Sequence, residues 1–488
     1  MKINQLTHLM LLLAMPLLLS YCKPTEVDPD TLVRTTATDT LSIAGVRSLA
    51  KLDIPGTVRI TDAGREGVYR LDIADKTSVD NMGTVLVTAG GRRYKRQYVG
   101  AANAYWFNVT TDDTDIGPEL QAAVDAAVEL VIPDGTYTQR TTVRLPGNRI
   151  LRANAGKVTI NLPATYVSLA SPVSNSLTFG NVTIDGLGWV VSSQEKGTYG
   201  VITIDGPTVS NLTIQNCTST DAAAKDSTNF LTLKIQTGKT ANNVLIQNNN
   251  IGAKRMAFEI FNHDNFNVYA GTNIRVAGNV VHDCHFGISL SGPMDGNTVV
   301  DNELRNCSLY GIEIAGALRN VVITNNRFAG KFDKLIIGSN DGQGNGTLQG
   351  GMEVSGNRTL GTCIGGVQLF NAGAANVNRN SLSLTGRLEI ISPSSNGGTY
   401  NQNVIETTGD NAVICDNAPN NKFLNNTFSN RTNGANIATF RAYGANAQNV
   451  TLNGNRIIKG KGGVSFDAVD GATLTATDNI NEAGAPIQ

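Results

Sequence analysis

The chain has 488 residues and a formal net charge of −1, so its overall charge gives no indication of a nucleic-acid-binding protein. Charged residues make up 16% of the chain, against about 25% in a typical globular domain, and 51 residues are glycine. Few charges with abundant Gly, Asn, Thr and Val predict an all-β protein built from short strands and turns.

The N-terminus predicts export. An apolar run extends from Leu9 to Leu19, about half of the roughly 20 residues that a membrane span requires. It is typical of the core of a signal peptide over residues 1–22. Cys22 resembles the lipidated cysteine of a bacterial lipobox, although Tyr21 replaces the usual small residue. The resemblance implies a membrane anchor through Cys22 and an outer-membrane lipoprotein, periplasmic or on the cell surface. A cleaved, secreted protein is the alternative.

A small unit separates this leader from the main body. Residues 23–39 are polar, contain two prolines and predict a linker. Residues 40–105 predict a small β module, because 83–98 alternate apolar and polar side chains around a Gly-Gly turn. This segment and the residues AYWF at 104–107 are similar to the β module that precedes the helical body in tail-spike-like proteins.

A short helix is expected next. Apolar residues recur at helical spacing within 110–127, and Pro118 falls in the first turn, where its missing N–H costs little. The acidic residues Asp112, Asp113 and Asp115 precede it and suit an N-cap.

The rest of the chain repeats a short apolar strand that ends in asparagine. The asparagines stand at 249, 279, 302, 326, 357, 380, 403, 426 and 455. A basic spacing of 23 residues, lengthened by insertions, predicts ten to twelve three-sided coils that stack on one another. We expect the asparagines to form a ladder that holds the turns, where Asn also tolerates a left-handed backbone. Their expected role is structural, with no ligand.

Residues 110–127 and the following LVIPDGTYTQRTTVRLP at 130–146 resemble the opening of pectin-lyase-like proteins, although the Gly-rich piece often seen before the Asp pair is absent. The resemblance implies a right-handed parallel β-helix over residues 106–488, capped by the short helix. The family includes polysaccharide lyases, glycosidases, epimerases and phage tail spikes. A polysaccharide is therefore the implied partner, with no organic cofactor and calcium left open.

One strand of each coil can be aligned. Side chains alternate across a strand, so outward positions on successive coils form a column. The alignment places outward Lys234, Glu259, Ser289, Glu313 and Gln368 between inward apolar residues. The inward positions are Leu233, Phe258, Ile288, Ile312 and Val367, and then Ile235, Ile260, Leu290, Ile314 and Leu369.

This column is the candidate site. Glu259 and Glu313 would lie two coils apart, about 9.6 Å at the backbone, which suits the acid and base of an inverting glycosidase. A lyase would instead need a base and a cation, for which Lys234 or Arg255 are candidates. Two other interpretations stay open: a non-catalytic glycan-binding or surface-display groove using Ser289 and Gln368, and a solvated stripe in which Lys234 pairs with Glu259.

The histidines and aromatic residues fall near the same coils. His282 is a candidate for proton transfer, and His263 and His285 for sugar contact, although ordinary surface histidines are also common. A zinc site at His282 and His285 is disfavoured, so no metal is assigned. The insertion at 262–272 carries Tyr269 and begins beside Phe261, and both rings could stack on sugars.

Two cysteines occupy equivalent repeat positions. Cys284 and Cys307 each follow a ladder asparagine by five residues, so they should stack on adjacent coils. That spacing allows either a disulfide or a buried, reduced pair. No redox role is expected for them.

Overall fold

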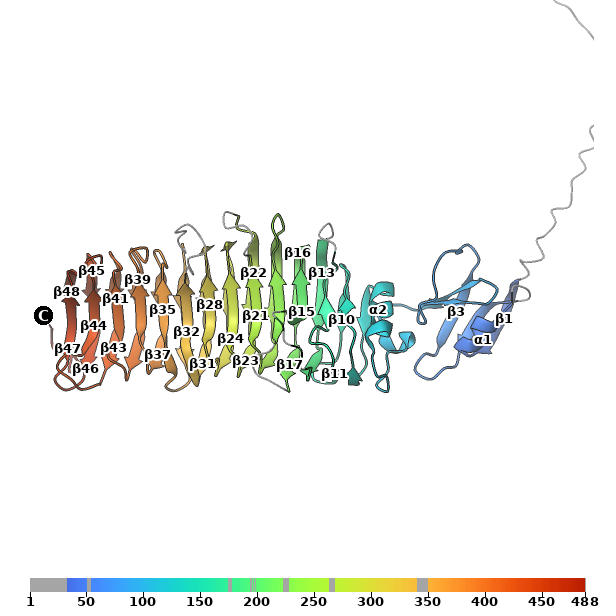
Figure 1. Cartoon of the computed structure of the whole chain (residues 1–488), viewed down its shortest axis with the longest axis horizontal. Coiled ribbons are helices and arrows are strands. Elements are labelled where there is room, and N and C mark those ends of the chain that lie inside the picture. The colour runs from blue at the N-terminus through green and yellow to red at the C-terminus, as the bar shows by residue number, and fades with distance from the viewer. Residues whose placement is uncertain are drawn as a thin grey trace, which may run out of the picture. The chain divides into compact units, whose positions relative to one another are not determined.

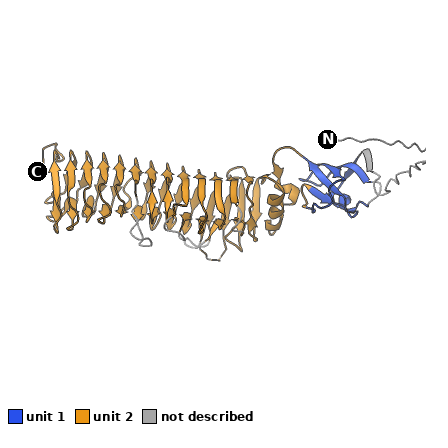
Figure 2. Cartoon of the chain, turned by 90° about the horizontal axis from the view of Figure 1, so that it is seen from above, with its two compact units in different colours: residues 1–80, 85–97 blue, residues 81–84, 98–488 orange. Residues whose placement is uncertain are grey.

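The computed structural model describes residues 33–50, 54–173, 178–193, 195, 197, 199–222, 228–262, 268–339 and 350–487. The predictions for Cys22 and His263 lie outside these residues. Figure 2 colours two compact units, one of residues up to 80 with 85–97, the other of 81–84 with the rest of the chain. Within the described part, no helix is long and apolar enough to cross a membrane.

The first unit is a five-stranded sheet with one short helix. Its strand order is β1 (Val33–Leu41), β2 (Ile54–Ile60), β3 (Gly67–Asp72), β5 (Arg93–Gln97) and β4 (Val85–Val87), beside α1 (Ile43–Ser48). The predicted hairpin is β4–β5, whose strands pair antiparallel. Alternation buries Val58, Ile60, Tyr69, Leu86 and Tyr94 in a core that Ile43 and Val46 of α1 complete.

The second unit begins with the predicted cap. A 3₁₀ turn, η2 (Ala104–Phe107), leads to α2 (Gly117–Ala126), which buries Leu120 and Val124 at the start of the large core. Asp115 holds the helix start: its Oδ1 accepts from the N–H groups of Gly117 at 2.9 Å and Arg140 at 2.8 Å. Of the three aspartates predicted to cap the helix, Asp115 thus caps its N-terminus, from a position just outside the helix.

The body is a stack of coils whose strands build three parallel sheets, named B, C and D here (Figure 1). Sheets C and D have 13 strands each, slightly more than the predicted ten to twelve coils. Sheet B contains β6 (Ala102–Asn103), β7 (Glu129–Val131), β10 (Ile150–Arg152), β13 (Thr178–Asp185), β16 (Thr208–Gln215), β19 (Ala241–Gln247), β22 (Gly271–Ala277), β25 (Met294–Asp295), β26 (Thr298–Val300), β29 (Leu318–Arg319), β30 (Val322–Thr324), β33 (Glu353–Ser355), β36 (Asn376–Asn378), β39 (Thr399–Asn401), β42 (Lys422–Leu424), β45 (Val450–Asn453) and β48 (Leu474–Thr477).

The other two sheets follow in each coil. Sheet C contains β8 (Gly135–Thr138), β11 (Val158–Leu162), β14 (Gly188–Val191), β17 (Thr218–Asp221), β20 (Asn250–Gly252), β23 (Val280–His282), β27 (Glu303–Arg305), β31 (Arg327–Ala329), β34 (Arg358–Thr359), β37 (Ser381–Leu384), β40 (Val404–Thr407), β43 (Thr427–Asn430) and β46 (Arg456–Lys459). Sheet D contains β9 (Val143–Arg144), β12 (Leu169–Ala170), β15 (Gly200–Asp205), β18 (Asn229–Lys234), β21 (Met256–Phe261), β24 (Phe286–Ser291), β28 (Tyr310–Ala315), β32 (Lys331–Ser339), β35 (Ile364–Phe370), β38 (Leu388–Ile391), β41 (Val413–Asp416), β44 (Ala438–Tyr443) and β47 (Val464–Val469).

A single apolar core runs the length of this stack. The inward positions predicted on the aligned strands, such as Phe258, Ile288 and Ile312, are fully buried. One coil cannot bury its own apolar face, so each coil relies on its neighbours for that burial. The large core therefore depends on continuous stacking, and it fixes which side chains of each strand point outward.

The predicted asparagine ladder is confirmed between sheets B and C. At each step the backbone N–H and Nδ2 of one asparagine donate to Oδ1 of the next, as from Asn302 to Asn326 at 3.0 Å for both bonds. Nδ2 also donates to a backbone carbonyl, as Asn326 does to Val299 at 2.9 Å. The predicted left-handed conformation, however, belongs to the residue before the ladder asparagine: Asn325 has φ 57°.

The cysteines of the described part are buried and unlinked. Cys284 and Cys307 form no disulfide, which leaves the reduced alternative of the two that the sequence allowed. Burial raises the pKa of the Cys284 thiol to about 12, so this thiol is protonated and unreactive near neutral pH.

Candidate active site

An unbroken column of outward side chains runs along sheet D. Strand register connects Glu259 to Ser289 and Ser289 to Glu313. The whole column is Arg144, Ala170, Thr203, Thr232, Glu259, Ser289, Glu313, Ile337, Gln368, Glu389, Ile414, Arg441 and Asp467. The predicted stacking of Glu259, Ser289, Glu313 and, beyond one apolar coil, Gln368 is therefore confirmed.

The predicted position of Lys234 in this column is wrong. Thr232 is the register partner of Glu259, and Lys234 pairs with Phe261 two residues further along the strand. A slip of two residues keeps every side chain on the same face, so the apolar pattern of β18 fits both alignments. Lys234 therefore lies in a neighbouring outward column and places its Nζ 5.9 Å from the centre of the Phe261 ring.

Glu259 is held by polar groups on the previous coil and just before its own strand. Its Oε2 accepts from Nδ2 of Asn229 at 2.7 Å and from the hydroxyl of Thr232 at 3.2 Å. Oε1 faces the Arg255 guanidinium at 3.5 Å. Burial raises the pKa of Glu259, a shift that Arg255, Thr232 and Asn229 oppose. The site thus favours a protonated Glu259 more than water does.

Glu313 has a different environment. Its Oε2 accepts a hydrogen bond of 2.7 Å from the hydroxyl of Ser289, which is 3% exposed. At the start of the same strands, the rings of Phe286 and Tyr310 meet edge to face at 5.4 Å. Burial raises the pKa of Tyr310, and the nearby negative charge of Glu313 raises it further. A carboxylate beside half-buried rings offers both a charge and an apolar surface.

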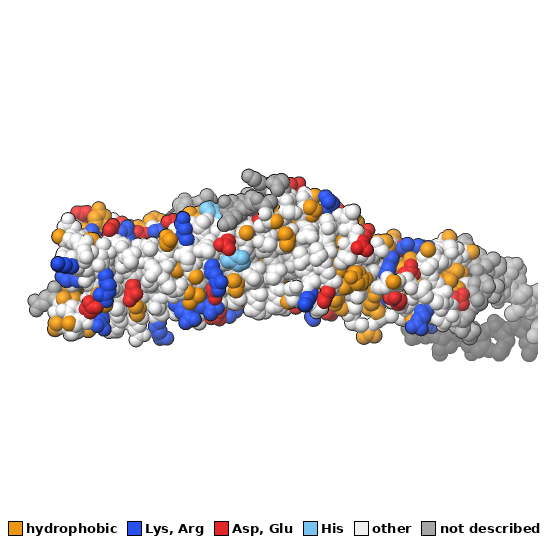
Figure 3. Space-filling view, turned by 90° about the horizontal axis from the view of Figure 1, so that it is seen from below, with side chains coloured by type: hydrophobic (Ala, Val, Ile, Leu, Met, Phe, Trp, Pro, Cys, Tyr) orange, Lys and Arg blue, Asp and Glu red, His pale blue; other side chains and the backbone are white. Residues whose placement is uncertain are grey.

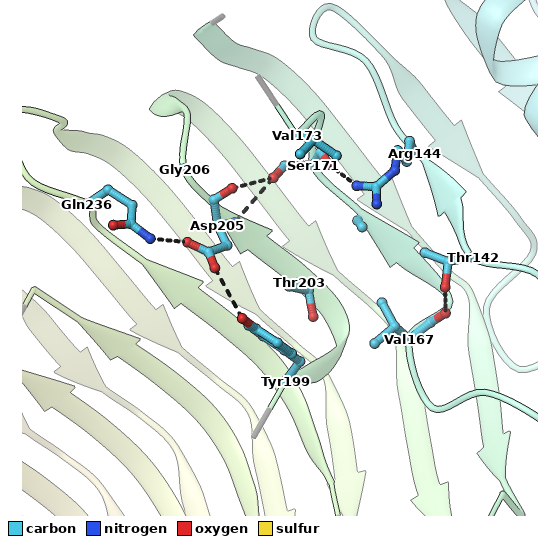
Figure 4. Close-up of a pocket in the computed structure, with 11 residues that line it drawn as sticks. Thr142, Arg144, Val167, Ser171, Val173, Tyr199, Thr203, Asp205, Gly206 and Gln236 are labelled. Atoms are coloured by element: carbon cyan, nitrogen blue, oxygen red, sulfur yellow. Dashed lines mark hydrogen bonds between the residues drawn. The ribbon is translucent and has the colours of Figure 1, made fainter. Parts of the chain in front are cut away.

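A pocket of about 470 Å³ opens on the same face, toward the N-terminal coils (Figure 4). Asp205 stands in it, with Oδ1 accepting from Gln236 at 2.6 Å and Oδ2 facing the Tyr199 hydroxyl at 3.5 Å. Arg144 donates to the carbonyl of Ser171, on the adjacent coil, at 3.2 Å. The lining residues are Thr142, Arg144, Val167, Ala170, Ser171, Val173, Tyr199, Thr203, Asp205, Gly206 and Gln236. Arg144 and Thr203 belong to the Glu259 column, so the pocket continues the line of the site.

A buried ion pair lies at the corner between sheets C and D that precedes β21. Lys254 and Asp221 pair there with 0% and 2% of their side chains exposed, and the Thr228 hydroxyl donates to Asp221 at 2.7 Å. Burial lowers the pKa of Lys254 and raises that of Asp221, and the partner's charge opposes each shift. Lys254 directly precedes Arg255 in the chain, so the pair anchors the segment that carries the Arg255 contact with Glu259.

The other predicted site residues lie on different sheets of the stack. Arg255 and Phe261 lie with the carboxylates on or beside β21. His282 ends β23 of sheet C, with its Nδ1 3.0 Å from Asp283, so it is separated from the site by the turn into sheet D. His285 lies at the entry to β24 and bonds Ser308 at 2.8 Å. Tyr269 stacks on Arg319, 4.0 Å from its ring centre, beside sheet B.

Several residues of the site were not predicted from the sequence. Asn229 and Thr232 hold Glu259, and Asp205 and Arg144 line the pocket. Correct register would have revealed Thr232, whereas the pocket depends on how the N-terminal coils and their turns meet. In the described residues, no group of three or more His, Cys, Asp or Glu side chains is arranged to hold a metal ion.

Two family models match the chain. Residues 41–99 match a small four-stranded β-sheet domain of phage tail proteins, and residues 172–382 match the right-handed β-helix region. The first match falls mainly on the sheet of the first unit, and the second covers the coils that carry Glu259 and Glu313.

Solved structures include similar chains with different functions. The tailspike protein of an Acinetobacter baumannii phage is 16% identical, with a TM-score of 0.46, and the match covers 87% of this chain but 65% of the tailspike. The surface adhesin PfbA of Streptococcus pneumoniae is 13% identical, with a TM-score of 0.42 and coverage of 78% and 97%. The catalytic unit of an α-1,3-glucanase from Streptomyces thermodiastaticus is 14% identical, with a TM-score of 0.44 and coverage of 80% and 73%. These likenesses leave the function of this chain open. From its sheets and its family match, the chain is a right-handed parallel β-helix protein with a small N-terminal β module.

Proposed function

We propose that this protein is an exported glycoside hydrolase that cleaves a polysaccharide lying along sheet D. One observation carries the proposal: Glu259 and Glu313 stand in one outward column with Ser289 between them, and burial raises the pKa of Glu259. Two carboxyl groups whose environments differ in this way suit the division into an acid and a base.

The assignment of roles follows from the contacts. Oε2 of Glu259 already accepts two hydrogen bonds, whereas Oε1 has only the long contact of 3.5 Å with Arg255, so a proton would sit on Oε1 and pass from there to the glycosidic oxygen. Glu313, oriented by Ser289, would take a proton from water as that water attacks the anomeric carbon and the C–O bond breaks. Two coils separate their backbones by about 9.6 Å, which leaves room for the water and predicts inversion.

The rest of the face would hold neighbouring sugars. The pocket around Asp205 offers a carboxylate, an amide and the Tyr199 ring beside the column. On the other side of Glu259, Gln368 provides an amide in the same column, and Phe261 provides a half-buried ring near Lys234. Hydrogen-bonding groups with aromatic surfaces suit a chain of hydroxylated rings.

Elimination by a lyase is supported less well. A lyase needs a cation to neutralise the uronate carboxylate, and Arg255 is already engaged by Glu259 and by Asn229, to which its Nε donates at 3.2 Å. Lys234 is displaced from the Glu259 column.

The second candidate function is a non-catalytic glycan-binding protein. Three donors already surround Glu259, as is typical of a carboxylate with a structural role, and this observation favours the second candidate.

The test is a screen of neutral and acidic polysaccharides with the purified protein, with and without calcium, that measures new reducing ends and unsaturated products. The proposal expects reducing ends without unsaturation, and their loss in Glu259→Gln and Glu313→Gln. Glu406→Gln, an exposed glutamate on sheet C, is the matched control and should keep full activity. Glycan binding without any cleavage would support the binding protein instead, and unsaturated products would support the lyase.

We also propose that residues 1–22 direct export and that Cys22 carries a lipid. The apolar run and the cysteine that follows it support this location. Lipid labelling of the protein in a bacterial host, lost in Cys22→Ser, is the expected result. Labelling that persists in that variant, or a soluble wild-type protein, would contradict the anchor.

A further inference from the structure

A basic cluster lies on sheet C, away from the carboxylate column on sheet D. Arg327 of β31 and Arg358 of β34 are register partners on adjacent coils, so their outward side chains start about 4.8 Å apart. Figure 3 views this side and shows Lys and Arg side chains gathered near the middle of the stack. Guanidinium groups carried on adjacent coils repel each other, and an anion between them relieves that repulsion.

The protein provides one carboxylate for this cluster. Glu303, the register partner of Arg327 on the preceding coil, has 9% of its side chain exposed. Its Oε2 lies 3.0 Å from Arg327, and Arg305 pairs with its Oε1. Glu303 is thereby shared by two arginines. Arg358, exposed one coil further on, has no hydrogen bond or ion pair from its guanidinium to any side chain in the described part of the chain.

A hollow opens beside these arginines, at the turn that carries Gly356. The residues that precede the ladder asparagines stack along the turn, and three of them are Asp301, Asn325 and Gly356, all with positive φ. A Cβ on Gly356 would lie 2.5 Å from Oδ1 of Asn325. Only glycine therefore fits at this position, and a cavity of about 380 Å³ opens beside it, lined by Asp301, Asn325, Arg327, Gly356 and Arg358.

The lining has a distinct chemistry. Arg327 and Arg358 present the planar donors that match a carboxylate. Asp301 and the Asn325 amide line the same hollow from the turn before the ladder asparagines and can accept hydrogen bonds from hydroxyl groups. A simple inorganic anion would use the arginines and meet repulsion from Asp301, whereas a ligand with a carboxylate and hydroxyls on one ring uses both kinds of group.

We infer that this hollow binds a carboxylate-bearing sugar residue, with the carboxylate on Arg358 and Arg327 and the ring hydroxyls toward Asp301 and Asn325. It is a second glycan contact on sheet C, independent of the cleavage proposed on sheet D. Such a site would hold an acidic polysaccharide on the surface while another part of that polymer, or another chain, occupies the sheet D face.

The test compares two probes that differ only at one carbon: methyl glucuronide, with a carboxylate, and methyl glucoside, with a hydroxymethyl group. Binding to the full chain is measured by saturation-transfer NMR titration. We expect the glucuronide to bind and the glucoside not to bind. Arg358→Gln should weaken glucuronide binding about tenfold or more, and Arg358→Lys should restore part of it, since charge returns without the paired donors.

Two control variants test whether glucuronide binding depends on this hollow. Arg275→Gln removes an exposed arginine from sheet B and should leave binding unchanged. Glu406→Gln removes an exposed glutamate from sheet C and should also bind the glucuronide normally. Because sugar binding and not cleavage is measured, failure of the proposed hydrolase would not affect this result. Equal binding of both sugars, unchanged binding in Arg358→Gln, or complete displacement by an equal concentration of inorganic phosphate would overturn the assignment.

Discussion

The hydroxyl of Ser289 donates a hydrogen bond of 2.7 Å to Oε2 of Glu313. Ser289 is nearly buried and occupies the coil between Glu313 and Glu259. It therefore fixes the direction of one carboxylate and provides the space between the two. In a stack where every coil repeats the same backbone, such side-chain contacts are what distinguish one coil from another.

Ser289→Ala should reduce turnover about tenfold on the substrate found by the screen, because it removes a hydrogen bond to a charged group worth about 1.5 kcal/mol. The fold should be retained, since the change is small. Ser291→Ala, in the neighbouring outward column of the same strand, is the matched control and should have a much smaller effect. Unchanged kcat in Ser289→Ala would mean that Glu313 needs no such orientation.

The stability of the protein should depend on pH through Glu259. Burial raises the pKa of Glu259 in the folded chain, so the folded state binds this proton more tightly than the unfolded state. Its contribution to the free energy of unfolding is complete below the ordinary glutamate pKa and is lost as pH rises through the raised value. Urea unfolding of wild type and Glu259→Gln is measured from about pH 4 to pH 8. As pH rises, the free energy of unfolding of wild type should fall relative to that of Glu259→Gln. A constant difference would contradict the raised pKa.

Removal of one partner of the buried ion pair should be costly. Lys254→Met would leave Asp221 buried without its cation, and the expected loss is about 3–5 kcal/mol in the free energy of unfolding. The double variant Lys254→Met/Asp221→Leu should recover much of that loss, because no charge then remains buried. Thermal and urea unfolding of the three proteins measure this coupling, and a double variant no more stable than Lys254→Met would refute it.

The ladder should tolerate little change at its centre. Asn326→Ala removes the Oδ1 that accepts from both the backbone N–H and Nδ2 of Asn302, which stay buried. Each unsatisfied group costs about 1–3 kcal/mol, so a loss of several kcal/mol in the free energy of unfolding is expected. Asn376→Ala, exposed on sheet B, should change it by less than about 0.5 kcal/mol. Similar urea midpoints for the two variants would count against a structural role for the ladder.

Much of the fold could be predicted because the repeat is visible in the sequence. The spacing of Asn302, Asn326 and their equivalents gave the coil length, and the burial of Phe258 and Ile288 agrees with the expected alternation. The left-handed turn position was misplaced by one residue, since Gly, Asn and Asp occur just before the ladder as well as in it. Composition identifies such a turn but does not show which residue takes the positive φ.

The site was only partly predictable. Glu259 and Glu313 could be predicted because each is a charged residue within an apolar strand pattern. A shift of two residues in the alignment leaves such a residue on the same face of the sheet, so this prediction does not depend on the register. Lys234 was misplaced because Leu231, Leu233 and Ile235 fit the core at two registers. His282 was grouped with the carboxylates by its coil, although sheet C carries it. The pocket at Asp205 and the hollow at Gly356 are lined partly by turn residues, whose positions no strand pattern encodes.

The proposed hydrolysis requires Glu259 and Glu313 to act as acid and base across one water molecule. The most direct measurement is ¹H NMR of the first product formed from a cleaved polysaccharide, before its anomers equilibrate. We predict an anomeric configuration opposite to that of the substrate linkage, with no signal in Glu313→Gln. A product of retained configuration, or one with a new double bond, would contradict it.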